Sequence, residues 1–212
     1  MNSVDLLKYE KELYKEGYKL IAGCDEVGRG PLVGPVVAAA VILPINYSLP
    51  GLTDSKKLSE KKRNEFYDII KRDAISYGIG EVSASEIDEI NIYEASRKAM
   101  LIALDNLSVK PDYILTDAMP LPKDNSKSII HGDALSLTIA AASVLAKVTR
   151  DAMMYELDKK YPMYGFKDHK GYPTKKHLEN ISKYGILSNY RRSYKPVQKI
   201  IEMGNFSENN EK

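Results

Sequence analysis

Two apolar runs joined by a short glycine-rich turn most constrain what this chain can fold into. The first run, residues 20–24, ends in the acidic pair Asp25 and Glu26, and the second, residues 33–43, is rich in valine and alanine. The segment GRGPLVG lies between them. Apolar stretches connected this closely are typical of an antiparallel strand pair at the centre of a sheet.

The rest of the chain alternates between helical and strand patterns. After the paired runs, apolar spacing predicts strands over 75–82, 113–116 and 128–130, and helices over 1–18, 59–72 (with Ser59 as N-cap), 92–107, 134–161, 175–184 and 196–203. We expect an α/β fold in which helices cover a mixed sheet. No repeat or linker separates two cores, so the pattern indicates one domain with a helical C-terminal appendage.

Composition limits where the protein works and what it binds. Of 212 residues 43% are hydrophobic, enough to bury a sizeable core. The formal net charge is 31 − 29 = +2, which neither demands nor excludes a polyanionic partner. The single cysteine, Cys24, excludes an intrachain disulfide and fits a reducing compartment. The longest apolar run, 36–43, is too short to span a bilayer, and residues 1–19 lack the apolar stretch of a signal peptide. We expect a cytoplasmic protein without a membrane partner.

Four acidic residues each stand at the end of a predicted apolar element: Asp25, Glu26, Asp117 and Asp133. Neighbouring strands are about 4.8 Å apart, so their ends can bring such carboxylates together, where they repel one another unless a cation lies between them. Oxygen ligands without thiolate or imidazole suit Mg²⁺ or Mn²⁺, and two such ions support phosphodiester cleavage. The alternative is that each acid only forms a turn, or that Asp133 is a helix N-cap.

Three further segments offer weaker signals. The glycines of Gly28-Arg29-Gly30 allow the backbone to approach a ligand closely, although a tight turn with an exposed arginine explains them equally. Residues 54–57 could contact phosphate or simply begin a solvated helix. Tyr172 could stack on a sugar or base, but with 15 tyrosines in the chain most must be structural.

The joint pattern resembles one family. IAGCDEVGRGPLVGPVVAAA from Ile21 resembles the first signature of ribonuclease HII, and the likeness continues through DSKKLSEKKR, LTDAMPLP, HGDALSLTIAAASVLAKVTRD, YPMYGFKDHKGYPTKKH and RRSYKPV. It covers the chain from about residue 20 to residue 197. The resemblance implies a ribonuclease H-like fold: a mixed five-stranded sheet flanked by helices, with a helical C-terminal extension.

The same resemblance implies a Mg²⁺- or Mn²⁺-dependent endonuclease. It would cut 5′ of ribonucleotides in RNA–DNA hybrids and of single ribonucleotides embedded in duplex DNA, by two-metal catalysis that leaves 3′-hydroxyl and 5′-phosphate ends. The family's motifs match catalytic and metal-binding Asp25, Glu26, Asp117 and Asp133, the 2′-hydroxyl-sensing Gly28, Arg29 and Gly30, the junction-sensing Tyr172, and the phosphate-side Lys56 and Lys147. We expect a monomer.

The expected division of the chain follows from the resemblance. Residues 1–18 form an N-terminal helical segment, 19–162 the catalytic core, 163–203 a loop and helical extension that completes the substrate cleft, and 204–212 a flexible tail. Two alternative functions stay open: another two-metal nuclease on this fold, such as a junction resolvase, and a non-catalytic hybrid-binding module.

Two positions depart from the family's usual residues, and the histidines point to no metal site. Ala118 stands where many relatives have glycine, and His131 stands where lysine is frequent. Neither replaces an acidic ligand, so we still expect the activity, and the two departures would at most tune affinity for the metal or the hybrid. His131, His169 and His177 are not spaced like zinc ligands.

Overall fold

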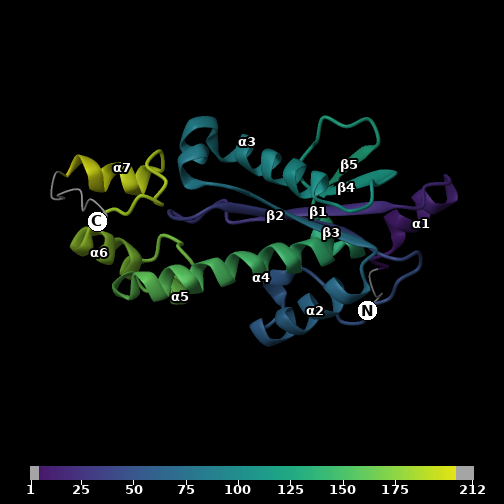
Figure 1. Cartoon of the computed structure of the whole chain (residues 1–212), viewed down its shortest axis with the longest axis horizontal. Coiled ribbons are helices and arrows are strands. Elements are labelled where there is room, and N and C mark those ends of the chain that lie inside the picture. The colour runs from purple at the N-terminus through teal and green to yellow at the C-terminus, as the bar shows by residue number, and fades with distance from the viewer. Residues whose placement is uncertain (1–4, 204–212) are drawn as a thin grey trace.

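A single five-stranded sheet organises the fold of the computed structural model, which describes residues 5–203 (Figure 1). The strand order is β3-β2-β1-β4-β5, with β1 (Ile21–Val27), β2 (Val36–Ile42), β3 (Ser76–Val82), β4 (Tyr113–Asp117) and β5 (Ser126–Ile129). β2 is antiparallel to β1 and β3, whereas β4 is parallel to β1 and β5. The mixed five-stranded sheet and the antiparallel pair around the glycine-rich turn are confirmed.

Helices cover both faces of this sheet. They are α1 (Lys8–Lys15), α2 (Glu60–Asp73), α3 (Ala84–Asp105), α4 (Leu137–Lys160), α5 (Phe166–His169), α6 (Lys175–Tyr184) and α7 (Lys195–Glu202), with short 3-10 turns η1 (Ser55–Lys57), η2 (Gly132–Ala134) and η3 (Pro162–Tyr164). α3 lies on one face, while α4 lies on the other and carries α2 on its outer side (Figure 1). Because β2 is covered on both faces, all seven of its residues are buried and apolar.

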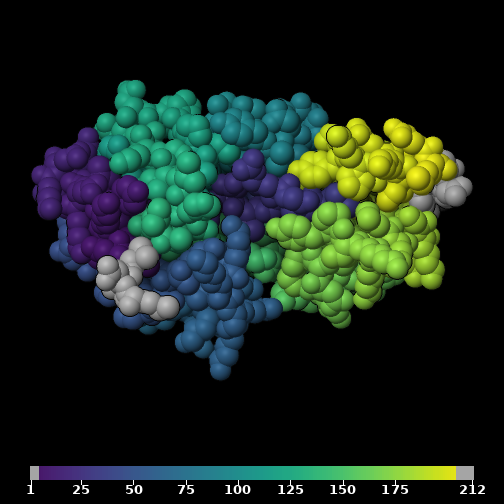
Figure 2. Space-filling model, turned by 180° about the vertical axis from the view of Figure 1, so that it is seen from behind, coloured from purple at the N-terminus to yellow at the C-terminus, as the bar shows by residue number. Residues whose placement is uncertain are grey.

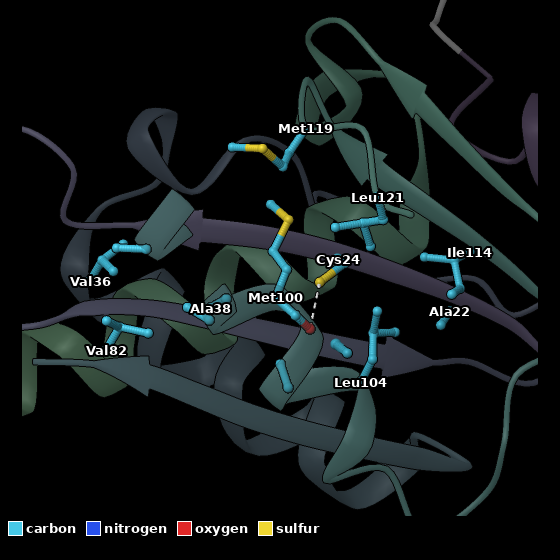
Figure 3. Close-up of a cluster of buried hydrophobic side chains, with 14 of the residues drawn as sticks. Ala22, Cys24, Val36, Ala38, Val82, Met100, Leu104, Ile114, Met119 and Leu121 are labelled. Atoms are coloured by element: carbon cyan, nitrogen blue, oxygen red, sulfur yellow. Dashed lines mark hydrogen bonds between the residues drawn. The ribbon is translucent and has the colours of Figure 1, made fainter. Parts of the chain in front are cut away.

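The two covering helices approach the sheet closely because small residues meet them. A Cβ built on Gly23 of β1 would lie 2.1 Å from the backbone of Thr138 in α4, and one built on Gly80 of β3 would lie 2.1 Å from Ala99 in α3. Under α3, Cys24 points from β1 toward the helix, where its thiol faces the Met100 carbonyl at 3.9 Å (Figure 3). Cys24 is therefore a packing residue of the core.

Two predicted elements differ from the structure. The helix predicted from residue 92 is only the second part of α3, which begins at Ala84. Asn91 separates the two parts with a φ of 68°, and its side chain accepts hydrogen bonds from the Tyr93 and Glu94 amides, as a second N-cap would. The loop predicted after α4 contains η3 and α5. The Ser59 cap is confirmed, since its hydroxyl accepts the Lys62 amide at 3.3 Å. Residues 204–212, predicted to be a flexible tail, lie outside the described residues.

The C-terminal helices α5 to α7 share a small apolar core with the glycine-rich loop, which we define as residues 28–34. Leu32 and Val33 of this loop pack with Phe166, Ile181 and other buried C-terminal side chains. In the space-filling view the early part of the chain, in purple, reaches the surface beside the green and yellow C-terminal part (Figure 2). Among residues 5–203 no helix is both long enough and apolar enough to cross a membrane.

Candidate active site

Three of the four predicted acids come together at one end of the sheet. Parallel pairing sets Cys24 of β1 beside Thr116 of β4, so Asp25 and Asp117 follow at the same edge. Asp133 lies in η2, just after β5, and the Asp117 carboxylate accepts the amide of Gly132 at 2.7 Å, which fixes η2 against β4. One carboxylate oxygen from each of Asp25, Asp117 and Asp133 lies within 4.8 Å of the others. We call this set the carboxylate triad.

The carboxylates of the triad repel one another, and this repulsion suits a site for a cation. Burial, and then the charges of Glu26, Asp117 and Asp133, raise the pKa of Asp25 well above its usual range. Burial and Asp117 likewise raise the pKa of Asp133, although Lys56 opposes the shift. Oxygen ligands gathered at this distance suit a hard divalent ion, which would offset the repulsion between them.

The fourth acid, Glu26, stands beside the triad rather than in it. One of its oxygens accepts a hydrogen bond from Arg29 at 3.3 Å, while the other is buried without a hydrogen-bonding partner. Burial raises the pKa of Glu26, Arg29 lowers it, and Asp117 raises it again. A buried carboxylate oxygen without a partner is costly, and a bound cation would satisfy it.

The glycine-rich loop is held from behind by two fully buried arginines. Arg191 donates to the carbonyls of Gly28, Arg29 and Gly34 at 2.6, 3.0 and 3.0 Å. Arg150 of α4 lies so close to Gly28 that a Cβ on this glycine would sit 2.2 Å from the Arg150 Nε, and Gly28 also has a φ of +95°. Glycine is therefore required at position 28 for both space and conformation.

These two arginines were not predicted as functional residues. Arg150 also donates to the carbonyls of Val33 and Pro35, at 3.2 and 3.1 Å, and burial lowers its pKa to about 10. A signal for it exists in the sequence, because Ala146, Arg150 and Met154 recur every four residues on the buried face of α4. A charged side chain on such a face needs buried partners, and here backbone carbonyls supply them.

Tyr172 lies against the glycine-rich loop. The residue is 42% exposed, and a Cβ built on Gly30 would come within 3.2 Å of the Tyr172 Cε1. The tyrosine is carried by the short connection between α5 and α6, in which the Gly171 carbonyl accepts the Leu32 amide at 2.8 Å. Gly30 and Tyr172, 142 positions apart in the sequence, therefore form one surface.

The two predicted lysines differ in position. The ammonium of Lys56 lies 3.7 Å from the Asp133 carboxylate, and although partial burial opposes it, attraction to Asp133 raises the pKa of Lys56. Lys147 instead forms an ion pair at 2.7 Å with Asp151, one turn along α4. Lys56 is thus beside the triad, whereas Lys147 is held by a neighbour on its own helix.

The two departures from the family's usual residues share a backbone conformation. Ala118, directly after Asp117, has a φ of 49°, and His131, two residues before Asp133, has a φ of 58°. The left-handed region favours glycine, which agrees with the glycine that the family resemblance leads us to expect at position 118. Ala118 accepts this strain while the Asp117 carboxylate stays in the triad.

A mixed sheet with a carboxylate triad at the ends of two parallel strands is typical of a metal-dependent hydrolase of phosphate esters. Comparison with known proteins defines the group more closely. The family model of ribonuclease HII matches residues 22–197. A ribonuclease HII of Bacillus cereus is 57% identical over 200 residues, which cover 94% of this chain and 78% of that protein.

Solved structures agree with this assignment. The ribonuclease H2 of Pyrococcus horikoshii OT3 superposes with a TM-score of 0.74 at 28% identity, covering 86% of this chain and 97% of that one. A chain in the PCNA:RNase HII complex from Archaeoglobus fulgidus gives 0.68 at 26% identity, with 83% and 95% covered. The chain belongs to the ribonuclease HII family and is a ribonuclease H, a hydrolase that acts on RNA–DNA hybrids.

Proposed function

We propose that the protein incises single ribonucleotides embedded in duplex DNA as well as the RNA strand of hybrids, always on the 5′ side of the ribonucleotide. The observation that carries this proposal is the closeness of the Tyr172 ring to Gly30, where a Cβ would lie 3.2 Å from the Tyr172 Cε1. It joins a flat, partly exposed aromatic surface to a backbone with no side chain in the way. A 2′-hydroxyl can approach such a backbone, and the next sugar can pack on the ring.

The triad and Glu26 would hold the metal. Asp25, Asp117 and Asp133 offer converging oxygens, and Glu26 offers the buried oxygen that has no partner. These donors fit Mg²⁺ or Mn²⁺ better than zinc. Two such ions, when bound, supply an activated water and stabilise the leaving 3′-oxygen, so that cleavage leaves a 3′-hydroxyl and a 5′-phosphate.

The remaining residues would bind and orient the substrate. Gly30 keeps the exposed backbone of the glycine-rich loop open to a ligand, and Gly28 supplies the positive φ that lets the loop turn beside Arg150. Arg29 is exposed between them and contacts Glu26 at 3.3 Å. Lys56 stands at the triad and is largely exposed, so it can reach a phosphate of the cleaved strand. To contact a phosphate, Lys147 would have to exchange its ion pair with Asp151 for the backbone of the substrate.

The test is cleavage of a DNA duplex that contains one ribonucleotide, with products mapped at nucleotide resolution and an all-RNA strand paired with DNA as the second substrate. We expect a cut 5′ of the ribonucleotide only when Mg²⁺ or Mn²⁺ is present. An all-DNA duplex is the negative control. Cleavage of a four-way DNA junction instead would favour a resolvase, and binding without cleavage would favour a non-catalytic module.

Tyr172→Ala should lower cleavage of the single embedded ribonucleotide about ten- to a hundredfold, because stacking contacts of this kind contribute about 1–3 kcal/mol. The all-RNA hybrid should lose less, and Tyr172→Phe, which keeps the ring, should retain more activity than alanine. Equal losses on both substrates, together with a lower melting temperature, would mean that Tyr172 only braces its loop.

A further inference from the structure

Two of the three histidines lie stacked beneath the connection that carries Tyr172. His169 ends α5 and His177 lies in the first turn of α6, and their ring centroids are 4.1 Å apart with planes at 17°. Both rings are buried, with 8% and 0% of each residue exposed. Neither histidine belongs to the triad, and both bind groups of the surrounding backbone.

Hydrogen bonds fix the tautomer of His169. Its Nδ1 accepts the Gly171 amide at 3.2 Å, so this nitrogen carries no proton. The ring proton must then lie on Nε2, which donates to the Tyr164 carbonyl at 3.0 Å. His169 therefore holds the amide of the residue that precedes Tyr172.

His177 has the opposite tautomer. A carbonyl can only accept, so the Nδ1 of His177 donates to the Tyr172 carbonyl at 2.8 Å. Its Nε2 is then free to accept from the hydroxyl of Tyr190 at 2.8 Å. Burial lowers the pKa of His177 to about 4 and also lowers the pKa of His169, which keeps both rings neutral at neutral pH.

The stacked pair thus grips the backbone on both sides of the tyrosine. His169 accepts the N–H of Gly171, the residue before Tyr172, and His177 donates to the C=O of Tyr172 itself. Gly171 is fixed further by the Leu32 amide, which donates to its carbonyl at 2.8 Å, and by a φ of +84°. The Tyr172 amide also donates to the His169 carbonyl at 2.9 Å, and the Tyr172 carbonyl also accepts the Thr174 amide at 2.8 Å. The imidazole bonds add to these and help to hold the Tyr172 backbone where its ring lies beside Gly30.

We propose that His169 and His177 are positioning residues, a neutral imidazole pair of opposite tautomers that aims the Tyr172 ring at the sugar beyond the ribonucleotide. The proposal rests on the function proposed for Tyr172. The histidines touch no substrate and act only through the backbone they hold. The pair therefore sets how strongly an embedded ribonucleotide is preferred over continuous RNA.

The first part of the test is nitrogen NMR of the unsubstituted, ¹⁵N-labelled protein at pH 7. We expect His177 to carry its proton on Nδ1 and His169 to carry its proton on Nε2. The other tautomer in either ring, or a charged ring, would overturn the proposal. This measurement does not depend on any variant folding.

The second part uses two variants that differ by one methylene. The amide nitrogen of His177→Asn is bonded as Nδ1 is and can still donate to the Tyr172 carbonyl, whereas the amide of His177→Gln lies where Nε2 lies and faces Tyr190. His177→Gln should lose about tenfold on the single embedded ribonucleotide, the worth of one hydrogen bond of about 1.4 kcal/mol. It should change little on the all-RNA hybrid, and His177→Asn should retain most activity on both substrates.

The third part separates this proposal from the function it rests on. In a Tyr172→Ala background, His177→Gln should cause no further loss, because the group it positions is gone. A further loss there, equal effects of Asn and Gln, or equal losses on both substrates would overturn the positioning role while Tyr172 kept its own. If Tyr172→Ala itself lowers both substrates equally, the proposed function fails first and the positioning role fails with it.

Discussion

Replacing Asp117 by asparagine should raise the melting temperature of the metal-free protein while it abolishes turnover. One carboxylate oxygen of Asp117 lies within 4.8 Å of an oxygen of Asp25 and of Asp133, and the charge of Asp117 raises the pKa of both. Asparagine keeps the shape, and its carbonyl oxygen can still accept the Gly132 amide, now bonded at 2.7 Å. The substitution therefore removes a repulsive charge without removing the bond that fixes η2.

The magnitude follows from the spacing of the triad. Two unit charges 4.8 Å apart repel by about 3.5 kcal/mol at an effective dielectric constant of about 20. Proton uptake by the neighbouring carboxylates already relieves part of this repulsion, so we expect a net gain of about 1–2 kcal/mol. For a chain of this size that gain raises the melting temperature by about 2–8 °C.

The assay is thermal unfolding in EDTA, followed by titration with Mg²⁺. The unsubstituted protein should gain stability as the metal binds, and Asp117→Asn should lose most of that gain. Asp112→Asn is the matched control, because its exposed carboxylate accepts the Lys19 and Leu20 amides at 3.0 and 2.9 Å and should lose stability on neutralisation. A folded Asp117→Asn protein that melts lower in EDTA would refute the electrostatic reasoning, and near-normal turnover would refute the metal site.

Three more outcomes are expected. Hybrid affinity, measured by fluorescence anisotropy, should fall with salt by a slope of about 0.9 per neutralised phosphate, and Lys56→Gln should lower that slope by about one contact. A flat dependence would contradict the proposed phosphate contacts. Because the pKa of His177 is about 4 in the folded protein and about 6.5 when unfolded, acid protonates the unfolded chain first, so up to about 3 kcal/mol of stability is lost between pH 6.5 and 4. Urea unfolding should show a smaller loss for His177→Asn, and an equal loss would contradict this cause. Gly28→Ala, whose Cβ would sit 2.2 Å from Arg150, should destabilise by about 1–3 kcal/mol in the same assay, and unchanged stability would show that the loop shifts freely.

The sequence was most informative where chemistry depends on strand ends. Asp25 and Asp117 could be expected to meet because each directly follows an apolar strand, and strands that run parallel as neighbours end at the same edge. Asp133 followed the same logic through its position after β5. Local rules also located the Ser59 cap, since the signal lies within four residues of the helix it starts.

The supporting residues could not be predicted in the same way. Arg150 and Arg191 bind backbone carbonyls more than a hundred positions away, and a carbonyl has no residue type by which a sequence pattern could identify it. The spacing of His169 and His177 in the sequence excludes a zinc site but does not reveal that their rings stack and bind one backbone segment. The apolar pattern does not predict the start of α3 at Ala84, because Asn91 divides that pattern in two.

The bonds from Arg191 to the glycine-rich loop also have a consequence for the order in which the protein matures. A ribosome makes the chain from its N-terminus, so the residues of the triad leave it before Arg191 does. The triad precedes α4, whereas Arg191 follows α6. The carbonyls of Gly28 and Arg29 therefore lack their guanidinium partner until almost the whole chain has been made. The glycine-rich loop is thus the part of the proposed site that depends on nearly complete synthesis of the chain.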